Sequence, residues 1–198
     1  MGAGVLPVAI LNNKLYFLFG KERNRPNETA RGWADFGGGH EKNESALNTA
    51  GREGAEELSG FLGSESKIKK LLRKKKLVIK TDDNNYTTFI VPINYDKNLP
   101  VYFNNQIGFL RTYVDSRKLN STTMYEKEEI KWFSFNMLNK YKNKFRPFYR
   151  EIISKIIKNK CLLEEKFKIS KKKTKKICYN SVNKNLTKKN KLYIIKKN

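Results

Sequence analysis

Three glutamates near position 55 have the residue type and spacing of a metal site. Small and apolar residues recur there at three- and four-residue steps, which predicts a helix over residues 44–58. At about 100° per residue, such a helix carries Glu53, Glu56 and Glu57 along one edge. Like charges at this spacing repel, and hard oxygen donors suit magnesium or manganese beside phosphate groups. The pattern favours metal-assisted phosphoryl chemistry, and the alternative is a solvated acidic helix face.

Glycines inside and before this helix need an explanation. Gly51 and Gly54 fall in its interior, where each costs about 1 kcal/mol relative to alanine. Their presence predicts close packing against another backbone. Gly37, Gly38 and Gly39 precede the helix and predict a loop whose backbone can approach a ligand closely.

The remaining elements are predicted from hydropathy and turn signals, with polar breaks that suit two hairpins. Asn43 or Ser45 is expected to cap the helix over 44–58. The segment 99–119 has no clean period and is left unassigned. Predicted strands cover 5–10, 14–19, 33–36, 77–80, 86–94 and 130–135, and further helices are expected around 68–72 and over 146–158.

Charge narrows the class of partner. The chain has 198 residues with 42 Lys and Arg against 19 Asp and Glu, a net charge of +23. Fourteen lysines and two glutamates lie in 159–198 alone. This balance favours polyanionic partners, either nucleic acid or a phosphate-rich small molecule, and disfavours neutral sugar chemistry. An AT-rich genome would also supply lysine, asparagine and isoleucine without selection for binding, so both origins of the tail's charge stay open.

Cysteine use and the apolar N-terminus bear on the compartment. Cys161 and Cys178 lie far from the single His40, so neither a disulfide framework nor a zinc site is expected. The apolar start, Met1 to Leu11, is too short for a secretory or membrane-spanning segment and is expected to be a strand. We expect a cytoplasmic protein without a membrane partner, and Lys171 to Lys176 also resembles a nuclear-import signal. The sequence does not indicate an oligomeric state.

The segment from Gly38 to Gly60 resembles the signature of the Nudix hydrolases, G-x5-E-x7-R-E-U-x-E-E-x-G-U, where U is a bulky aliphatic residue. The arginine and all four glutamates of the signature are in register. Three positions depart from it: Gly54 and Gly60 replace aliphatic residues, and Ser59 replaces glycine. These departures concern packing and the helix end more than chemistry.

The resemblance implies an α/β/α sandwich with a mixed β-sheet. An initial strand, the Trp33 to Gly39 entry and a Trp132 strand before a last helix are similar to the family's order of elements. We therefore expect a Nudix hydrolase domain over residues 1–158 and a Lys-rich, flexible basic tail over 159–198.

The resemblance also implies an enzyme that cleaves phosphoric anhydride bonds in a nucleoside diphosphate linked to another group. Arg52 would pair with Glu44 to hold the loop. Glu53, or an acid from a later loop for which Glu126 is favoured, would be the general base. Mg²⁺ or Mn²⁺ would be held by Gly38, Glu53, Glu56 and Glu57, and substrate phosphates are expected at Lys21, Arg23 and Arg31.

The substrate must be inferred from charge, because the family's signature identifies the reaction and not the leaving group. Ser66 to Lys80 carries seven lysines and an arginine, which favours salt-dependent, sequence-tolerant RNA binding. We therefore favour capped mRNA, as in the mRNA-decapping members. Two alternatives remain: hydrolysis of free nucleotides or diphosphoinositol polyphosphates, and a catalytically inactive Nudix-fold RNA-binding module.

Overall fold

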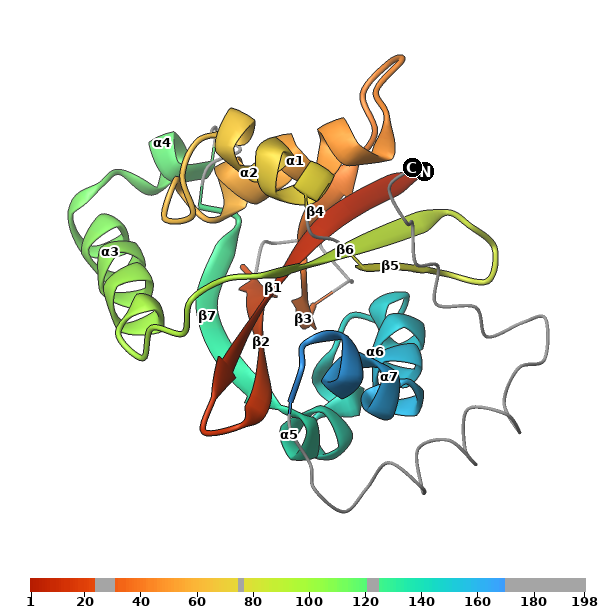
Figure 1. The fold of residues 1–198 in the computed structure, drawn as a ribbon. Helices are drawn as coiled ribbons and strands as arrows, with labels where there is room; N and C mark the ends of the chain where they lie inside the picture. Colours follow the sequence, from red (N-terminus) through yellow and green to blue (C-terminus); the bar gives the residue numbers. More distant parts are fainter. Residues whose placement is uncertain (24–30, 75–76, 121–124, 170–198) are drawn as a thin grey trace.

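The computed structural model describes residues 1–23, 31–74, 77–120 and 125–169 of the chain. Its centre is a sheet with strand order β3-β2-β1-β6-β5, in which β4 also pairs with β1 and β7 with β2 (Figure 1). Only β1 and β6 pair in parallel among the described strands, so the sheet is mixed. The strands are β1 (Gly2–Leu11), β2 (Lys14–Glu22), β3 (Trp33–Ala34), β4 (Phe36–Gly39), β5 (Leu77–Lys80), β6 (Tyr86–Pro92) and β7 (Lys127–Ser134).

Strand β1 is buried on both faces, as its unbroken apolar sequence predicts. Val5 and Ala9 face one hydrophobic cluster, while Leu6 and Val8 face the other. This strict alternation fixes which side chains meet each layer of helices, because successive residues of a strand point to opposite faces.

Helices cover both faces of the sheet, as Figure 1 shows. On one face lie α1 (Ala46–Glu57), α2 (Glu65–Lys74), α3 (Leu99–Tyr113) and α4 (Ser116–Asn120). On the other lie α5 (Phe135–Lys140), a short 3₁₀ turn η1 (Lys142–Lys144), α6 (Tyr149–Lys158) and α7 (Lys160–Lys166). Each layer has its own buried cluster against the sheet. The predicted α/β/α sandwich with a mixed sheet is confirmed.

The triple glycine is a strand and not the predicted loop. Strand β4 pairs antiparallel with β1, placing Gly37 opposite Gly4 and Gly38 opposite Ala3. A Cβ on Gly37 would lie 2.5 Å from the carbonyl oxygen of Ala3. Glycine is therefore needed here because two backbones approach closely.

Two further features differ from expectation. The unassigned segment 99–119 contains the helices α3 and α4. The packed body continues past the boundary expected at residue 158, because Leu163 and Ile169 join the buried cluster under α6. Residues 170–198, most of the expected basic tail, lie outside the described residues.

Within the described part of the chain, no helix is both long enough and apolar enough to cross a membrane.

Candidate active site

Helix α1 begins at Ala46, two residues after the predicted start, and Ser45, one of the two predicted caps, is its N-cap. The Ser45 hydroxyl accepts a hydrogen bond from the Asn48 amide at 3.3 Å, which caps the first turn. The two interior glycines lie against side chains rather than the predicted backbone. A Cβ on Gly54 would lie 2.5 Å from a methyl of Val5 on β1, and one on Gly51 would meet the stem of Lys69 at 2.5 Å. Glycine thus lets α1 lie close to the sheet and to α2.

Arg52 and Glu44 form the predicted pair. The Arg52 Nε donates to one Glu44 oxygen at 3.2 Å and a terminal nitrogen donates to the other at 3.0 Å, a two-point bond with planar complementarity. The hydrogen bonds from Arg52 lower the pKa of Glu44 from its ordinary 4.5 to about 2. The loop before α1 is therefore fixed to the helix by a charged pair.

The same guanidinium reaches three further groups. It donates to the Gly39 carbonyl oxygen at 3.1 Å and to a Glu53 oxygen at 2.8 Å, and it lies 3.6 Å from a Glu56 oxygen. Glu41 adds a longer contact of 3.7 Å. Four carboxylates, including Glu44, thus surround one cation.

Sequence reasoning missed two members of this network. The Thr49 hydroxyl donates to Glu44 at 2.7 Å and lies 2.7 Å from Nδ1 of His40. Because a hydroxyl has one proton to give, a Thr49 that donates to Glu44 accepts from His40. His40 therefore supports the Glu44 carboxylate through Thr49. Glu44 lies in the loop before α1, so helical spacing gives no sign of its contact with Thr49.

Gly38 provides the space that Glu53 occupies. An ideal Cβ on Gly38 would lie 2.5 Å and 2.9 Å from the two Glu53 carboxylate oxygens. The Gly38 carbonyl oxygen lies against the neighbouring strand, 2.7 Å from where a Cβ of Gly2 would be. The structure thus brings Gly38 to Glu53 by steric fit, and its role as a ligand stays a prediction.

Glu53, Glu56 and Glu126 lie within electrostatic reach of one another. Burial raises the pKa of Glu53 above its ordinary value; Arg52 opposes this, and the charges of Glu56 and Glu126 add to it. Burial likewise raises the pKa of Glu56, with Glu126 again contributing. Glu126, the loop acid favoured from the sequence, therefore lies near Glu53 and Glu56. It immediately precedes β7, which begins at Lys127.

Glu57 has a different environment from the other two motif acids. Its carboxylate is buried, with 3% of the side chain exposed, and lies 2.9 Å from the Nζ of Lys127. The second oxygen accepts a hydrogen bond from the Gly37 amide at 2.7 Å. Lys127 is fully buried and also forms an ion pair with Glu22 on β2. Sequence reasoning missed Lys127, because a lysine next to Glu126 is expected to be exposed.

A β-bulge explains how Lys127 turns inward. The pairing of β2 with β7 shifts register between Lys21 and Glu22, so that Lys21 faces Glu129 while Glu22 faces Lys127. Glu128 is the extra residue, and a bulge of this kind redirects the neighbouring side chain. Lys127 and Glu128 consequently both contact residues on the α1 and α3 side of the sheet.

The donor set fits a divalent cation only in part. Glu53 and Glu56 offer hard carboxylate oxygens in a region with excess negative charge, which suits Mg²⁺ or Mn²⁺. Glu57 does not fit in the same way, because it is buried against the Lys127 ammonium and each of its oxygens already accepts one hydrogen bond. Among the described residues, no three His, Cys, Asp or Glu side chains are gathered closely enough to hold a metal ion as they stand.

The predicted phosphate-binding residues lie at different depths. Lys21 forms an ion pair with Glu128 at 2.5 Å and keeps 41% of its side chain exposed. The Arg23 amide donates to the Glu126 carbonyl oxygen at 2.8 Å, which places Arg23 beside the loop acid. Arg31 is exposed. Lys21 and Arg23 are thus brought to the same edge as Glu126, and their contacts with substrate stay predictions.

Comparisons with known proteins identify the fold. A C. elegans Ap4A hydrolase matches with a TM-score of 0.50 at 15% identity, over 83% of this chain and 99% of that chain. A Nudix hydrolase from M. smegmatis, RenU, gives 0.45 at 14% identity, over 82% and 87%. A MutT/Nudix family protein from Listeria innocua gives 0.43 at 19%, over 85% and 94%. No family model matches the sequence, and no curated protein matches it significantly. The chain therefore has the fold of the C. elegans Ap4A hydrolase.

Proposed function

We propose that this Nudix-fold protein is a metal-dependent pyrophosphohydrolase that cleaves a phosphoric anhydride bond in a nucleoside diphosphate linked to another group. The observation that carries the proposal is the Arg52 cluster. One guanidinium faces four carboxylates there, and Glu53 lies in a space that only a glycine at position 38 leaves open. Such an excess of negative charge at a rigid helix edge is a cost to folding that a bound cation would relieve.

Mg²⁺ or Mn²⁺ would be held by Glu53 and Glu56, and when bound it would lower the pKa of a water and neutralise pyrophosphate charge. Arg52 orients Glu53 through its 2.8 Å hydrogen bond and cannot itself lose a proton near neutral pH. Glu126 is the proposed general base, because it lies at the same edge, and Glu53 is the alternative. Lys21 and Arg23 would contact the phosphates there.

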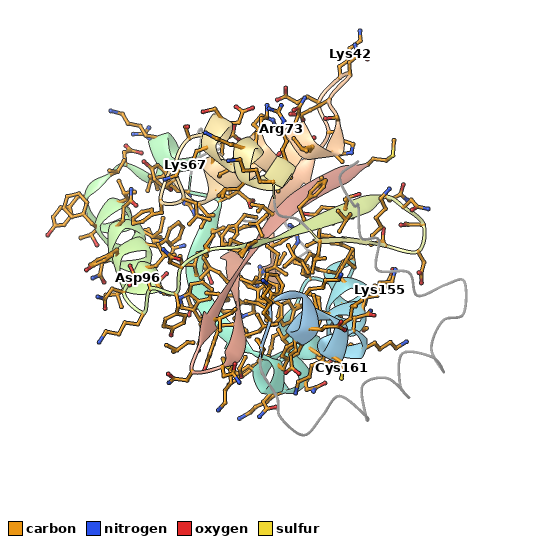
Figure 2. The ribbon with its side chains drawn as sticks, viewed as in Figure 1. Lys42, Lys67, Arg73, Asp96, Lys155 and Cys161 are labelled. Carbon is orange, nitrogen blue, oxygen red and sulfur yellow. The ribbon has the colours of Figure 1, made fainter. Side chains whose placement is uncertain are left out.

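Capped mRNA is the substrate that we favour, and the surface of α2 supports it. Lys67, Lys70, Arg73 and Lys74 are exposed, and none of these four has an ion pair with a described residue. Figure 2 shows Lys67 and Arg73 on the α1–α2 side of the sheet, on the same side as the acids of α1. A phosphate backbone running from the site over α2 would find a row of cations. Lys69, by contrast, is held by Glu65.

Two other functions have a specific observation in their favour. Free nucleotides or diphosphoinositol polyphosphates are also polyanions, and Lys21 and Arg23 at the site edge need no RNA to act. A catalytically inactive RNA-binding module is favoured by the Lys127 contact with Glu57, because it removes one motif acid from an open position. We propose a cytoplasmic location, and the nuclear-import resemblance of Lys171 to Lys176 lies outside the described residues.

Product analysis distinguishes these functions. Cap-labelled RNA, free nucleotides and diphosphoinositol polyphosphate are incubated separately with the full chain and Mg²⁺ or Mn²⁺. Release of cap nucleoside diphosphate from RNA alone supports decapping. Cleavage of the small substrates alone supports the metabolite function, and RNA binding without any cleavage supports the inactive module.

A further inference from the structure

Among Glu53, Glu56 and Glu57, only Glu57 forms an ion pair with Lys127, the buried lysine of β7, in the described structure. We infer that Lys127 is a built-in counter-cation for Glu57, so that the divalent-ion site is confined to Glu53, Glu56 and their edge, and Glu57 is a positioning residue. The inference rests on the proposed function, because it describes which acids serve the metal.

The Lys127 ammonium beside Glu57 repels a second cation from this carboxylate. One carboxylate oxygen lies 2.9 Å from the Lys127 Nζ, and the other accepts from the Gly37 amide at 2.7 Å. The Lys127 ammonium has three N–H groups, and it donates a second one to Glu22. The contact ties α1 to β2, β4 and β7 at once. Removing Glu57 from this position would leave a fully buried ammonium with one carboxylate fewer.

Charge balance separates the two clusters. Around Lys127, the two carboxylates of Glu22 and Glu57 face two basic groups, because Arg146 also pairs with Glu22 at 2.8 Å. That cluster is neutral and needs no further cation. Around Arg52, four carboxylates face one guanidinium, and this excess attracts a divalent ion.

The backbone is built to admit the lysine. A Cβ on Gly20 of β2 would lie 2.9 Å from both Cγ and Cδ of Lys127, so a side chain there would displace the lysine stem. The bulge at Glu128, opposite the step from Lys21 to Glu22, turns the Lys127 side chain inward. Burial by itself would lower the pKa of Lys127, but the charges of Glu57 and Glu22 raise it above its ordinary value. The ammonium is therefore a fixed charge at neutral pH.

Calorimetric titration of the full chain with Mn²⁺ tests the assignment. Glu56→Gln should weaken Mn²⁺ binding at least tenfold, whereas Glu57→Gln should leave the affinity within threefold of the wild type. The control is Glu65→Gln, a half-exposed acid of α2 that pairs with Lys69 and acts on Glu56 only through its charge, and it should change the affinity by less than threefold. A Glu57→Gln loss equal to that of Glu56→Gln, or no Mn²⁺ binding by the wild type, would overturn the inference.

A double variant keeps the test valid if Glu57→Gln folds poorly. Glu57→Gln combined with Lys127→Met removes both charges of the pair and leaves Glu22 with Arg146. Its Mn²⁺ affinity should also stay within threefold of the wild type, and a tenfold loss would again overturn the inference. Hydrolysis is measured separately. A wild type that binds Mn²⁺ through Glu56 but cleaves no substrate refutes the proposed function and leaves the inference standing.

Discussion

Substituting Gly38 by alanine should impair hydrolysis while leaving the protein folded. The added Cβ would lie 2.5 Å from the nearer Glu53 oxygen, and real Cβ atoms essentially never approach other heavy atoms below 3.0 Å. Glu53 must therefore retreat by at least the difference, about 0.5 Å, and its 2.8 Å bond to Arg52 lengthens or breaks. A displacement of about 1 Å at a reacting group can cost about 100-fold in rate, so we expect a loss of about 10- to 100-fold in kcat.

The free energy of unfolding of Gly38→Ala should differ little from that of the wild type. The obstructed atoms are the end of a flexible side chain, and Gly38 does not have a positive φ. The lost bond to Arg52 costs about 1 kcal/mol, and replacing glycine in the unfolded chain returns about 0.4–1 kcal/mol. We expect the Tm to shift by less than about 4 °C.

Gly39→Ala is the matched control for this prediction. An added Cβ there meets nothing within 4 Å, although Gly39 belongs to the same strand and its carbonyl accepts from Arg52. Steady-state kinetics and thermal unfolding are measured for both variants. Equal activity of Gly38→Ala and the wild type, or an equal loss in Gly39→Ala, would refute the steric argument.

Three further perturbations test other parts of the account. The pKa of Glu44 is lowered from its ordinary 4.5 to about 2. Its contribution to the free energy of unfolding is therefore fully present above pH 4.5 and is lost as the pH falls toward 2. Glu44→Gln should therefore cost about 2 kcal/mol in urea unfolding at pH 7, after allowance for solvent screening, and progressively less from about pH 5 to pH 3; an undiminished difference at pH 3 would contradict this. Arg52→Lys should lower hydrolysis at least about tenfold, since one ammonium cannot bond both Glu44 oxygens and the Gly39 carbonyl; wild-type kinetics would argue against the pair. Reversing Lys67 and Lys70 to Glu should weaken RNA binding and reduce its salt slope by about 1.4, with nucleotide hydrolysis unchanged; an unaltered slope would exclude α2 as the RNA surface.

Local periodicity made the motif helix predictable, because spacing along α1 alone fixes which residues share an edge. Glu44 lies in the loop before α1, so its two-point bond with Arg52 was expected from the family resemblance and not from helical spacing. The predicted hairpins are also confirmed, since turn residues and alternating strands carry local signals.

Contacts between distant segments could not be predicted in this way. Strand β4 is a run of glycines, which indicates a loop until β1 is seen beside it. Helix α3 buries Leu99, Phe103 and Ile107 at four-residue steps, but exposed Tyr102 and other aromatics obscure that period. Lys127 turns inward only because of a bulge, and single-sequence periodicity contains no sign of a bulge.

The most direct test of the central claim is the Mg²⁺ dependence of pyrophosphate cleavage by the wild type, Glu56→Gln and Glu65→Gln. A panel of nucleoside diphosphate compounds and cap-labelled RNA serves as substrate, and the products are identified at each Mg²⁺ concentration. We predict that the wild type and Glu65→Gln cleave the same anhydride bond with the same Mg²⁺ dependence, and that Glu56→Gln loses activity at every concentration. Equal cleavage by Glu56→Gln, or no Mg²⁺-dependent cleavage by the wild type, would contradict the account.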